Sequence, residues 1–259
     1  MDRKFFSVEV EPDMSRDMGT TAGSTAFQDK DILFDWTPFD VPKGSCQLKS
    51  VEAIFRGTNG ADQTTTVHDV ELIFAKSIDG NAPSTLGVIN AAVTASTTTG
   101  TGVGWFRNII GSIYMDATNN DNDGALTFIH TFSSSFEALR DAAILTGEPD
   151  SGTNVGFDKL YVAGIMHTTS GGLDFNTNVI LDGNVAENSA SVLTVGTTSA
   201  LNVFQKGDVI VAQDGALAGT VKALTATSIT LEANNAAALS NLDELFHKSP
   251  IRLQLGFEK

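Results

Sequence analysis

Short segments in which apolar and polar residues alternate are the feature that most restricts how this chain folds. In two segments every second side chain is strongly apolar: Val51, Ala53 and Phe55 in the first, and Val70, Leu72 and Phe74 in the second. Because successive side chains of a strand point to opposite faces, both segments are predicted to be β-strands. The link 57–62 contains Gly, Asn and Asp, which tolerate the backbone of a hairpin turn.

The rest of the chain continues this pattern. Further strands are expected at 5–10, 32–36, 126–132, 160–167, 175–181 and 252–257. The 24 glycines and many Thr, Ser and Asn residues supply turns between them, and the Thr/Gly-rich tract 91–104 is predicted to be a surface loop. Two segments, 136–145 and 234–246, have helix-forming composition with apolar residues on one face. The fold class is therefore mainly β.

A change of character after Gly183 indicates two structural units. Short strands at 192–195, 209–211, 218–223 and 228–231 suggest a small SH3-like β-barrel. We expect residues 1–183 and 250–259 to form a jelly-roll-like antiparallel β-sandwich, with residues 184–249 inserted before a last strand that returns to the main sheet. Internal repeats of 20–50 residues are absent from the sequence, which argues against a propeller, a solenoid or a triple β-helix fibre.

The segment between the first two expected strands is polar and rich in Gly, Ser and Thr around 19–24. Two interpretations stay open for it. It forms an ordered surface loop, or it is an arm that lies on a neighbouring subunit.

Charge excludes one class of partner. With 31 acidic and 16 basic side chains the chain carries a net charge of −15, without a cluster of Lys or Arg. A nucleic-acid backbone would be repelled, so we expect no nucleic acid partner. The apolar runs are too short to cross a bilayer, Glu9 interrupts any signal core at the N-terminus, and Cys46 is the single cysteine. We therefore expect a protein that folds in the cytoplasm, does not span a membrane and has no intramolecular disulfide.

Catalytic motifs do not emerge from the sequence. The four histidines, His68, His130, His167 and His247, lie outside any recognisable Ser-His or Cys-His signature, and we interpret each as a strand or helix-end residue. His68 and Asp69 are adjacent in a strand and point to opposite faces, whereas His130 and His167 could face each other across a sheet. The glycines at 100–104 lack the context of a phosphate loop. The scattered aromatic residues Trp36, Trp105, Tyr114 and Tyr161 are assigned to core packing rather than to a glycan platform. We expect neither an enzyme nor a cofactor.

One loop resembles a calcium site in part. Asn119, Asp121, Asp123 and Gly124 match the opening spacing of a calcium-binding loop, but His130 stands where a bidentate Glu is expected. These three oxygen-bearing residues form a weak metal candidate, and an Asx-rich turn is the alternative that we favour.

The chain resembles virion structural proteins of marine tailed bacteriophages in two features: the segment from Gly207 to Leu231 and the Gly/Thr/Asn-rich strands before it. The resemblance extends loosely over most of the chain and contains no diagnostic motif, so it assigns no binding residue. It implies a capsid decoration (cement) protein on the capsid surface, with the major capsid protein and copies of itself, as a homotrimer, for partners. A tail, neck or baseplate protein or a glycan-binding adhesin is the alternative, and an enzyme is the hypothesis with least support.

Overall fold

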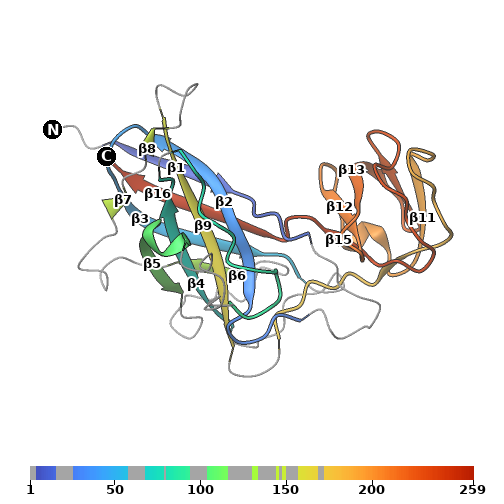
Figure 1. The fold of residues 1–259 in the computed structure, drawn as a ribbon. Helices are drawn as coiled ribbons and strands as arrows, with labels where there is room; N and C mark the ends of the chain where they lie inside the picture. Colours follow the sequence, from blue (N-terminus) through green and yellow to red (C-terminus); the bar gives the residue numbers. More distant parts are fainter. Residues whose placement is uncertain are drawn as a thin grey trace.

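The computed structural model describes residues 4–15, 26–57, 68–78, 80–93, 104–115, 130–133, 144–145, 148–149, 157–168 and 172–259. These residues are mainly β, and their only helices are two single 3-10 turns, η1 (Gly104–Arg107) and η2 (Ala200–Asn202). In Figure 1 the strands form a large unit and, at one end of it, a smaller unit in orange and red.

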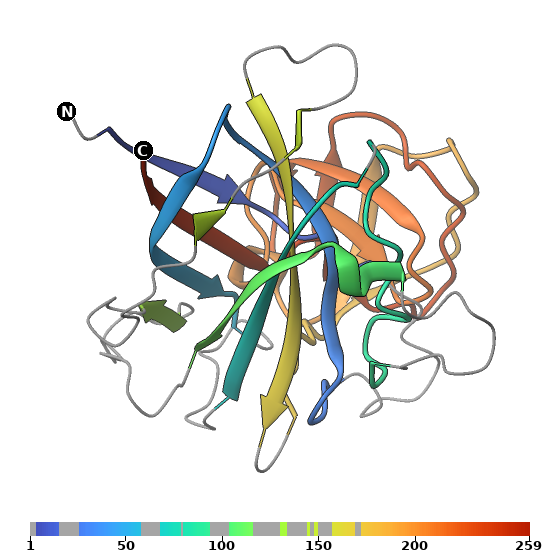
Figure 2. The ribbon, with the colours of Figure 1, turned by 60° about the vertical axis from the view of Figure 1, so that its left-hand side comes forward.

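Two antiparallel sheets make up the large unit, which we call the sandwich. The first has the order β1 (Phe5–Val10), β16 (Ile251–Glu258), β3 (Cys46–Phe55) and β6 (His130–Ser133), and β7 (Ile144–Leu145) also pairs with β3. The second has the order β2 (Ile32–Pro42), β9 (Phe157–Thr168), β4 (His68–Lys76) and β5 (Ile109–Met115), with β8 (Glu148–Pro149) on β9. Figure 2 looks onto this second sheet, from blue β2 through yellow β9 to green β5, with the smaller unit behind it.

The predicted alternation produces the core between the two sheets. In β16 the side chains of Ile251, Leu253, Leu255 and Phe257 are buried while the residues between them are more exposed, and β3 and β4 contribute the apolar rows expected from the sequence. Phe39 of the second sheet stacks on Phe257 of the first at a centroid distance of 6.2 Å. The two sheets therefore share one hydrophobic core, which stabilises the sandwich by removing apolar area from water.

The small unit, which we call the barrel, is a six-stranded antiparallel sheet. Its order is β10 (Val179–Leu181), β11 (Val192–Thr197), β14 (Ser228–Leu231), β13 (Leu217–Leu224), β12 (Val209–Ala212) and β15 (Leu245–His247). The edges of this sheet meet where the Leu181 N–H donates to Asp243 O at 2.8 Å and the Leu242 N–H donates to Leu181 O at 3.0 Å. The sheet is thus nearly closed around its own apolar core.

The barrel lies between β9 and β16 in the chain, and β16 pairs with both β1 and β3. One boundary differs from the sequence prediction, which assigned residues 1–183 to the sandwich. The strand β10 pairs with β11 and so belongs to the barrel sheet. The sequence does not place this boundary, because an apolar segment such as Val179–Leu181 would suit a strand of either unit. Only its pairing with β11 shows that it belongs to the barrel.

The predicted helix at 234–246 is wrong. Asn235 is fully buried, and its side-chain Oδ1 accepts hydrogen bonds from the Ser189 and Ala190 N–H groups at 3.1 and 3.0 Å. Its Nδ2 donates to Ala186 O and Ala237 O, both at 2.7 Å. An Asn side chain that satisfies backbone groups in this way competes with helix formation. The other predicted helix, 136–145, lies outside the described residues except for Ile144 and Leu145, which form β7 rather than a helix end.

Candidate functional site

The junction of sandwich and barrel contains a buried polar site that residues of both units form. The chain crosses from one unit to the other twice, after Phe175 and before Ile251. Two hydrogen bonds of 2.9 Å reinforce the second crossing, from the Met14 N–H to Lys248 O and from the Arg56 N–H to Pro250 O. A cavity of about 670 Å³ lies here, lined by residues from both units.

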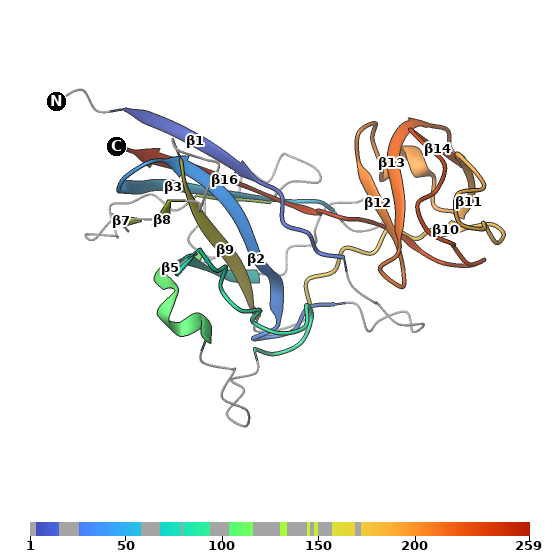
Figure 3. The ribbon, with the colours of Figure 1, turned by 45° about the horizontal axis from the view of Figure 1, so that its top comes forward.

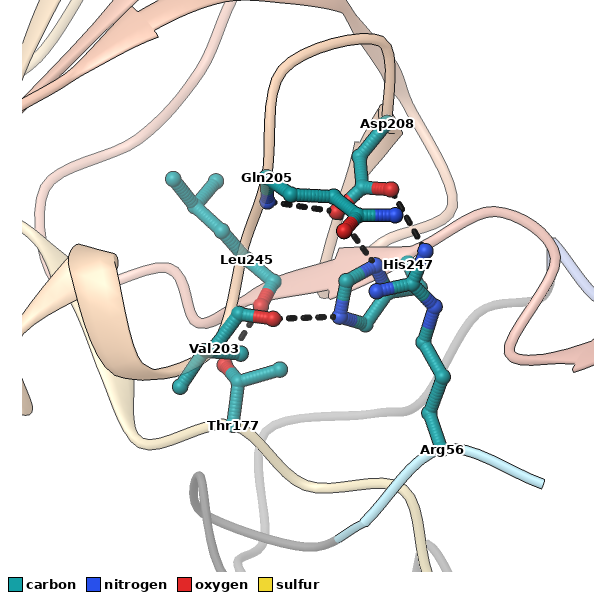
Figure 4. A network of polar contacts seen from close by, with 7 residues as sticks. All are labelled: Arg56, Thr177, Val203, Gln205, Asp208, Leu245 and His247. Atoms are coloured by element: carbon teal, nitrogen blue, oxygen red, sulfur yellow. Dashed lines mark hydrogen bonds and ion pairs between the residues drawn. The ribbon is translucent and has the colours of Figure 1, made fainter. Parts of the chain in front are cut away.

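An ion pair between Arg56 and Asp208 bridges the two units (Figure 4). Arg56 follows the end of β3, and its Nη2 lies 2.5 Å from Asp208 Oδ1 in the turn before β12. The Asp208 side chain is only 5% exposed, whereas Arg56 is one-third exposed. The other carboxylate oxygen, Oδ2, accepts a hydrogen bond from the Gln205 N–H at 2.8 Å. Both oxygens of this buried carboxylate therefore have donors, as a buried charge requires.

His247 of β15 lies beneath this pair. Its Nε2 is 3.2 Å from Val203 O, its Nδ1 is 3.5 Å from Asp208 Oδ2, and its ring packs on Phe204 at a centroid distance of 4.6 Å. Because a carbonyl oxygen only accepts, Nε2 carries the hydrogen. Burial lowers the pKa of His247 well below 6.5, and the nearby charge of Arg56 lowers it further. The imidazole is therefore neutral at neutral pH, with Nδ1 unprotonated.

The arrangement of these three side chains, which we call the junction network, is that of a structural tie. Asp208 is neutralised by Arg56, and the Nε2–H of His247 is used by a backbone carbonyl (Figure 4). Of the three side chains only Arg56 comes from the sandwich, so its ion pair with Asp208 is the contact that ties the barrel to the sandwich.

A second ion pair lies beside the network and also joins the two units. Lys248 Nζ is 3.0 Å from Asp13 Oδ2. Burial acts to raise the pKa of Asp13, but hydrogen bonds from Ser15 and the positive charge of Lys248 outweigh it and lower that pKa overall. The carboxylate of Asp13 therefore stays charged, and it strengthens the same junction.

A further polar cluster lies on the outer face of the second sheet. The Tyr114 hydroxyl of β5 donates to Asp69 Oδ2 of β4 at 2.7 Å, and Tyr114 packs at 5.4 Å from the ring of His167 in β9. His167 Nε2 lies 3.3 Å from Glu71 Oε2, and its Nδ1 lies 3.7 Å from Asp29 Oδ1. This corrects the assignment of Tyr114 to the core, because its side chain is 53% exposed.

The structure separates several residues that the sequence singled out. All four histidines lie in strands, but His130 is in β6 of the first sheet and His167 in β9 of the second, so they do not face each other across one sheet. The calcium candidates Asn119, Asp121 and Asp123 lie outside the described residues. Within the described residues, groups of three or more His, Cys, Asp or Glu side chains placed to hold a metal ion are absent.

Of the other aromatic residues, Tyr161 is buried and Trp36 is partly buried. The indole N–H of Trp36 donates to Ser84 O at 2.9 Å, which fixes the segment after β4 over the outer face of the second sheet. The side chain of Trp105 lies outside the described part of the chain. The described part contains no helix long and apolar enough to span a bilayer.

Sequence reasoning missed the junction network. Arg56 and Asp208 are separated by 152 positions, and neither belongs to a motif. The only local signal was a cation immediately after an alternating strand and a carboxylate after Gly207. Comparison with known proteins adds no assignment, since neither a protein-family model nor a curated protein matches the chain.

Proposed function

We propose that this chain is a structural component of a bacteriophage virion: a capsid decoration protein that binds the major capsid protein lattice and stabilises the head. In this proposal it is not an enzyme, it is made in the host cytoplasm, and it lies on the capsid surface as a homotrimer. The proposal starts from the resemblance described above and draws its main structural support from the order of the strands.

The strand order supports a jelly-roll interpretation of the sandwich. Its eight main strands have the order β1-β16-β3-β6 in one sheet and β2-β9-β4-β5 in the other. Numbered one to eight along the chain, the strands read 1-8-3-6 and 2-7-4-5, which is the order of two interlocked Greek keys. Jelly rolls are common in viral capsid domains, although a fold by itself does not assign a function. We interpret the inserted barrel as an SH3-like module.

The position of the barrel also fits a decoration protein. It is inserted between the seventh and eighth strands and extends from one end of the sandwich (Figures 1 and 3). In this proposal the sandwich binds the lattice, and the barrel faces the surroundings. Many copies on one shell would gain affinity through multivalency even if each contact is weak.

The test is to compare phage particles produced with and without the gene for this chain. The proposal predicts that the protein is present in purified heads in many copies, and that heads without it release their DNA at a lower temperature. Purified heads that lack the protein, or heads that are equally stable without it, would contradict the proposal.

A tail, neck or baseplate protein or a glycan-binding adhesin is the second candidate, and the cluster around Tyr114 favours it. An exposed aromatic ring beside the carboxylates of Asp69 and Glu71 offers both a stacking surface and acceptors for sugar hydroxyls. Binding to a panel of host glycans that is lost in Tyr114→Ala and kept in Tyr161→Phe would support this candidate over the first.

A further inference from the structure

The end of the sandwich farthest from the barrel differs in chemistry from the rest of the chain. We call it the distal end and define it as residues 4–6, 42–49, 157–159 and 257–259. Strand pairing brings these segments together: Phe5 lies opposite Glu258, Glu258 lies opposite Gln47, and Pro42 lies opposite Phe157. In Figures 1 and 3 β1 begins and β16 ends here, while the barrel lies at the opposite end.

Two phenylalanine side chains are exposed at the distal end, one from each sheet. Phe5 of β1 is 69% exposed and Phe157 of β9 is 46% exposed. Phe6 stacks on Phe257 in the core at 5.2 Å, so its neighbour Phe5 points away from the core. In β9 the neighbouring Asp158 is buried. Because successive side chains of a strand point to opposite faces, Phe157 points outward from the second sheet. The distal end therefore has an apolar anchor on each side.

Positive charge is concentrated around these two anchors. The distal end contains the five lysines Lys4, Lys43, Lys49, Lys159 and Lys259 and the two carboxylates Asp158 and Glu258. Two more acidic residues, Asp40 and Glu148, lie opposite Lys159 in the neighbouring strands. The whole chain, by comparison, has 16 basic and 31 acidic residues. Glu258 pairs with Lys49 at 2.9 Å, and Asp158 is buried. Lys4, Lys43 and Lys259 are exposed, and none of them forms an ion pair with a described carboxylate.

We propose that the distal end is the docking surface of the chain, and that its partner is an acidic recess with apolar walls between two subunits of the capsid lattice. This inference rests on the proposed function and assigns residues to it. Two aromatic anchors surrounded by cations have the character of a binding hot spot with a polar rim. Anchors on both sides of a narrow end fit a recess better than a flat surface.

An acidic protein surface is a better candidate for the partner than DNA or an anionic membrane. Outside the distal end the chain is strongly acidic, so a long polyanion such as DNA or an extended anionic membrane would be repelled by most of the molecule. A recess contacts the distal end alone. Complementary charge at its rim would speed association and make binding sensitive to salt.

The test uses heads produced without the gene for this chain, to which fluorescently labelled purified protein is added back. We expect Phe5→Ser and Phe157→Ser each to weaken binding at least 10-fold, and Lys43→Glu to weaken it mainly at low salt. Leu242→Ser and Lys222→Glu are the matched controls, since both side chains are exposed on the barrel. These controls should bind like the wild type, and circular dichroism should give all variants the same melting temperature.

The alternative results separate the two proposals. If the wild type binds heads and the distal-end variants bind equally well, the docking surface is wrong while the proposed function stands. If the wild type does not bind heads, the proposed function fails and the docking inference fails with it. Binding of the wild type to phosphatidylserine vesicles or to duplex DNA, or self-association that Phe5→Ser and Phe157→Ser abolish, would also overturn the assignment by identifying another occupant.

Discussion

Arg56 and Asp208 form an ion pair of 2.5 Å that joins the end of a sandwich strand to a turn of the barrel. Asp208 is the buried member, and its second oxygen faces the ring of His247 at 3.5 Å. The ion pair thus links the barrel directly to the sandwich.

Removing the cation should destabilise the protein. Arg56→Gln leaves the buried carboxylate of Asp208 without its charged partner, which costs about 3–5 kcal/mol for a fully buried pair and about 2 kcal/mol here, because Arg56 is one-third exposed. Urea unfolding measures the loss. Arg252→Gln is the control, since Arg252 lies 4.0 Å from Glu9 and both side chains are about half exposed. Equal stability of Arg56→Gln and the wild type would show that the ion pair does not tie the units.

Stability should fall as the pH drops below about 6.5, the unfolded pKa of histidine. The pKa of His247 is lowered in the folded state by burial and by Arg56, so the unfolded chain binds the proton more readily. The free energy of unfolding is therefore unaffected by His247 at pH 8 and decreases below pH 6.5. His247→Gln should flatten this decrease between pH 6.5 and 5.5 in urea titrations. The same slope in both proteins would assign the acid sensitivity to other groups.

Cys46 should be unreactive in the folded protein. Burial raises the pKa of its thiol to about 11; the charge of Lys259 acts in the opposite direction, and that of Asp158 raises the pKa further. The reactive thiolate is therefore scarce at pH 8. A chromogenic disulfide reagent should react with Cys46 only at the rate of unfolding, and at once in 6 M guanidinium. Fast reaction in native buffer would show that this part of β3 is accessible.

A methyl group at Gly164 should disrupt the core of the sandwich. A Cβ atom there would overlap the ring of Phe34, and overpacking of this kind costs about 1–3 kcal/mol. Gly164→Ala should lower the thermal midpoint. Gly196→Ala is the matched control within a barrel strand, because nothing lies within 4 Å of the added atom. An equal effect of the two substitutions would mean that the Phe34 contact does not limit packing.

Local patterns in the sequence predicted the sandwich strands because the two-residue repeat is itself the cause of burial. Leu253, Leu255 and Phe257 face the core since they are the apolar members of an alternating strand. The segment 234–246 failed because its alanines favour a helix, while the decisive interactions of Asn235 are made with residues 186–190, about 45 positions earlier.

The site was less predictable than the fold. Arg56 and Asp208 carry no local signature, because the contact depends on where the barrel is inserted and how it folds back on β3. The distal end posed the same difficulty, since its lysines come from four separate segments that only strand pairing brings together. Individual strands follow from neighbouring residues, whereas both surfaces follow from topology.

A cryo-electron microscopy reconstruction of the intact phage particle would locate this chain. We expect its density on the outer surface of the head, with Phe5 and Phe157 against the capsid lattice and the barrel directed away from it. Density in the tail, absence of the chain from the particle, or a barrel that faces the lattice would contradict the proposed function or the docking surface.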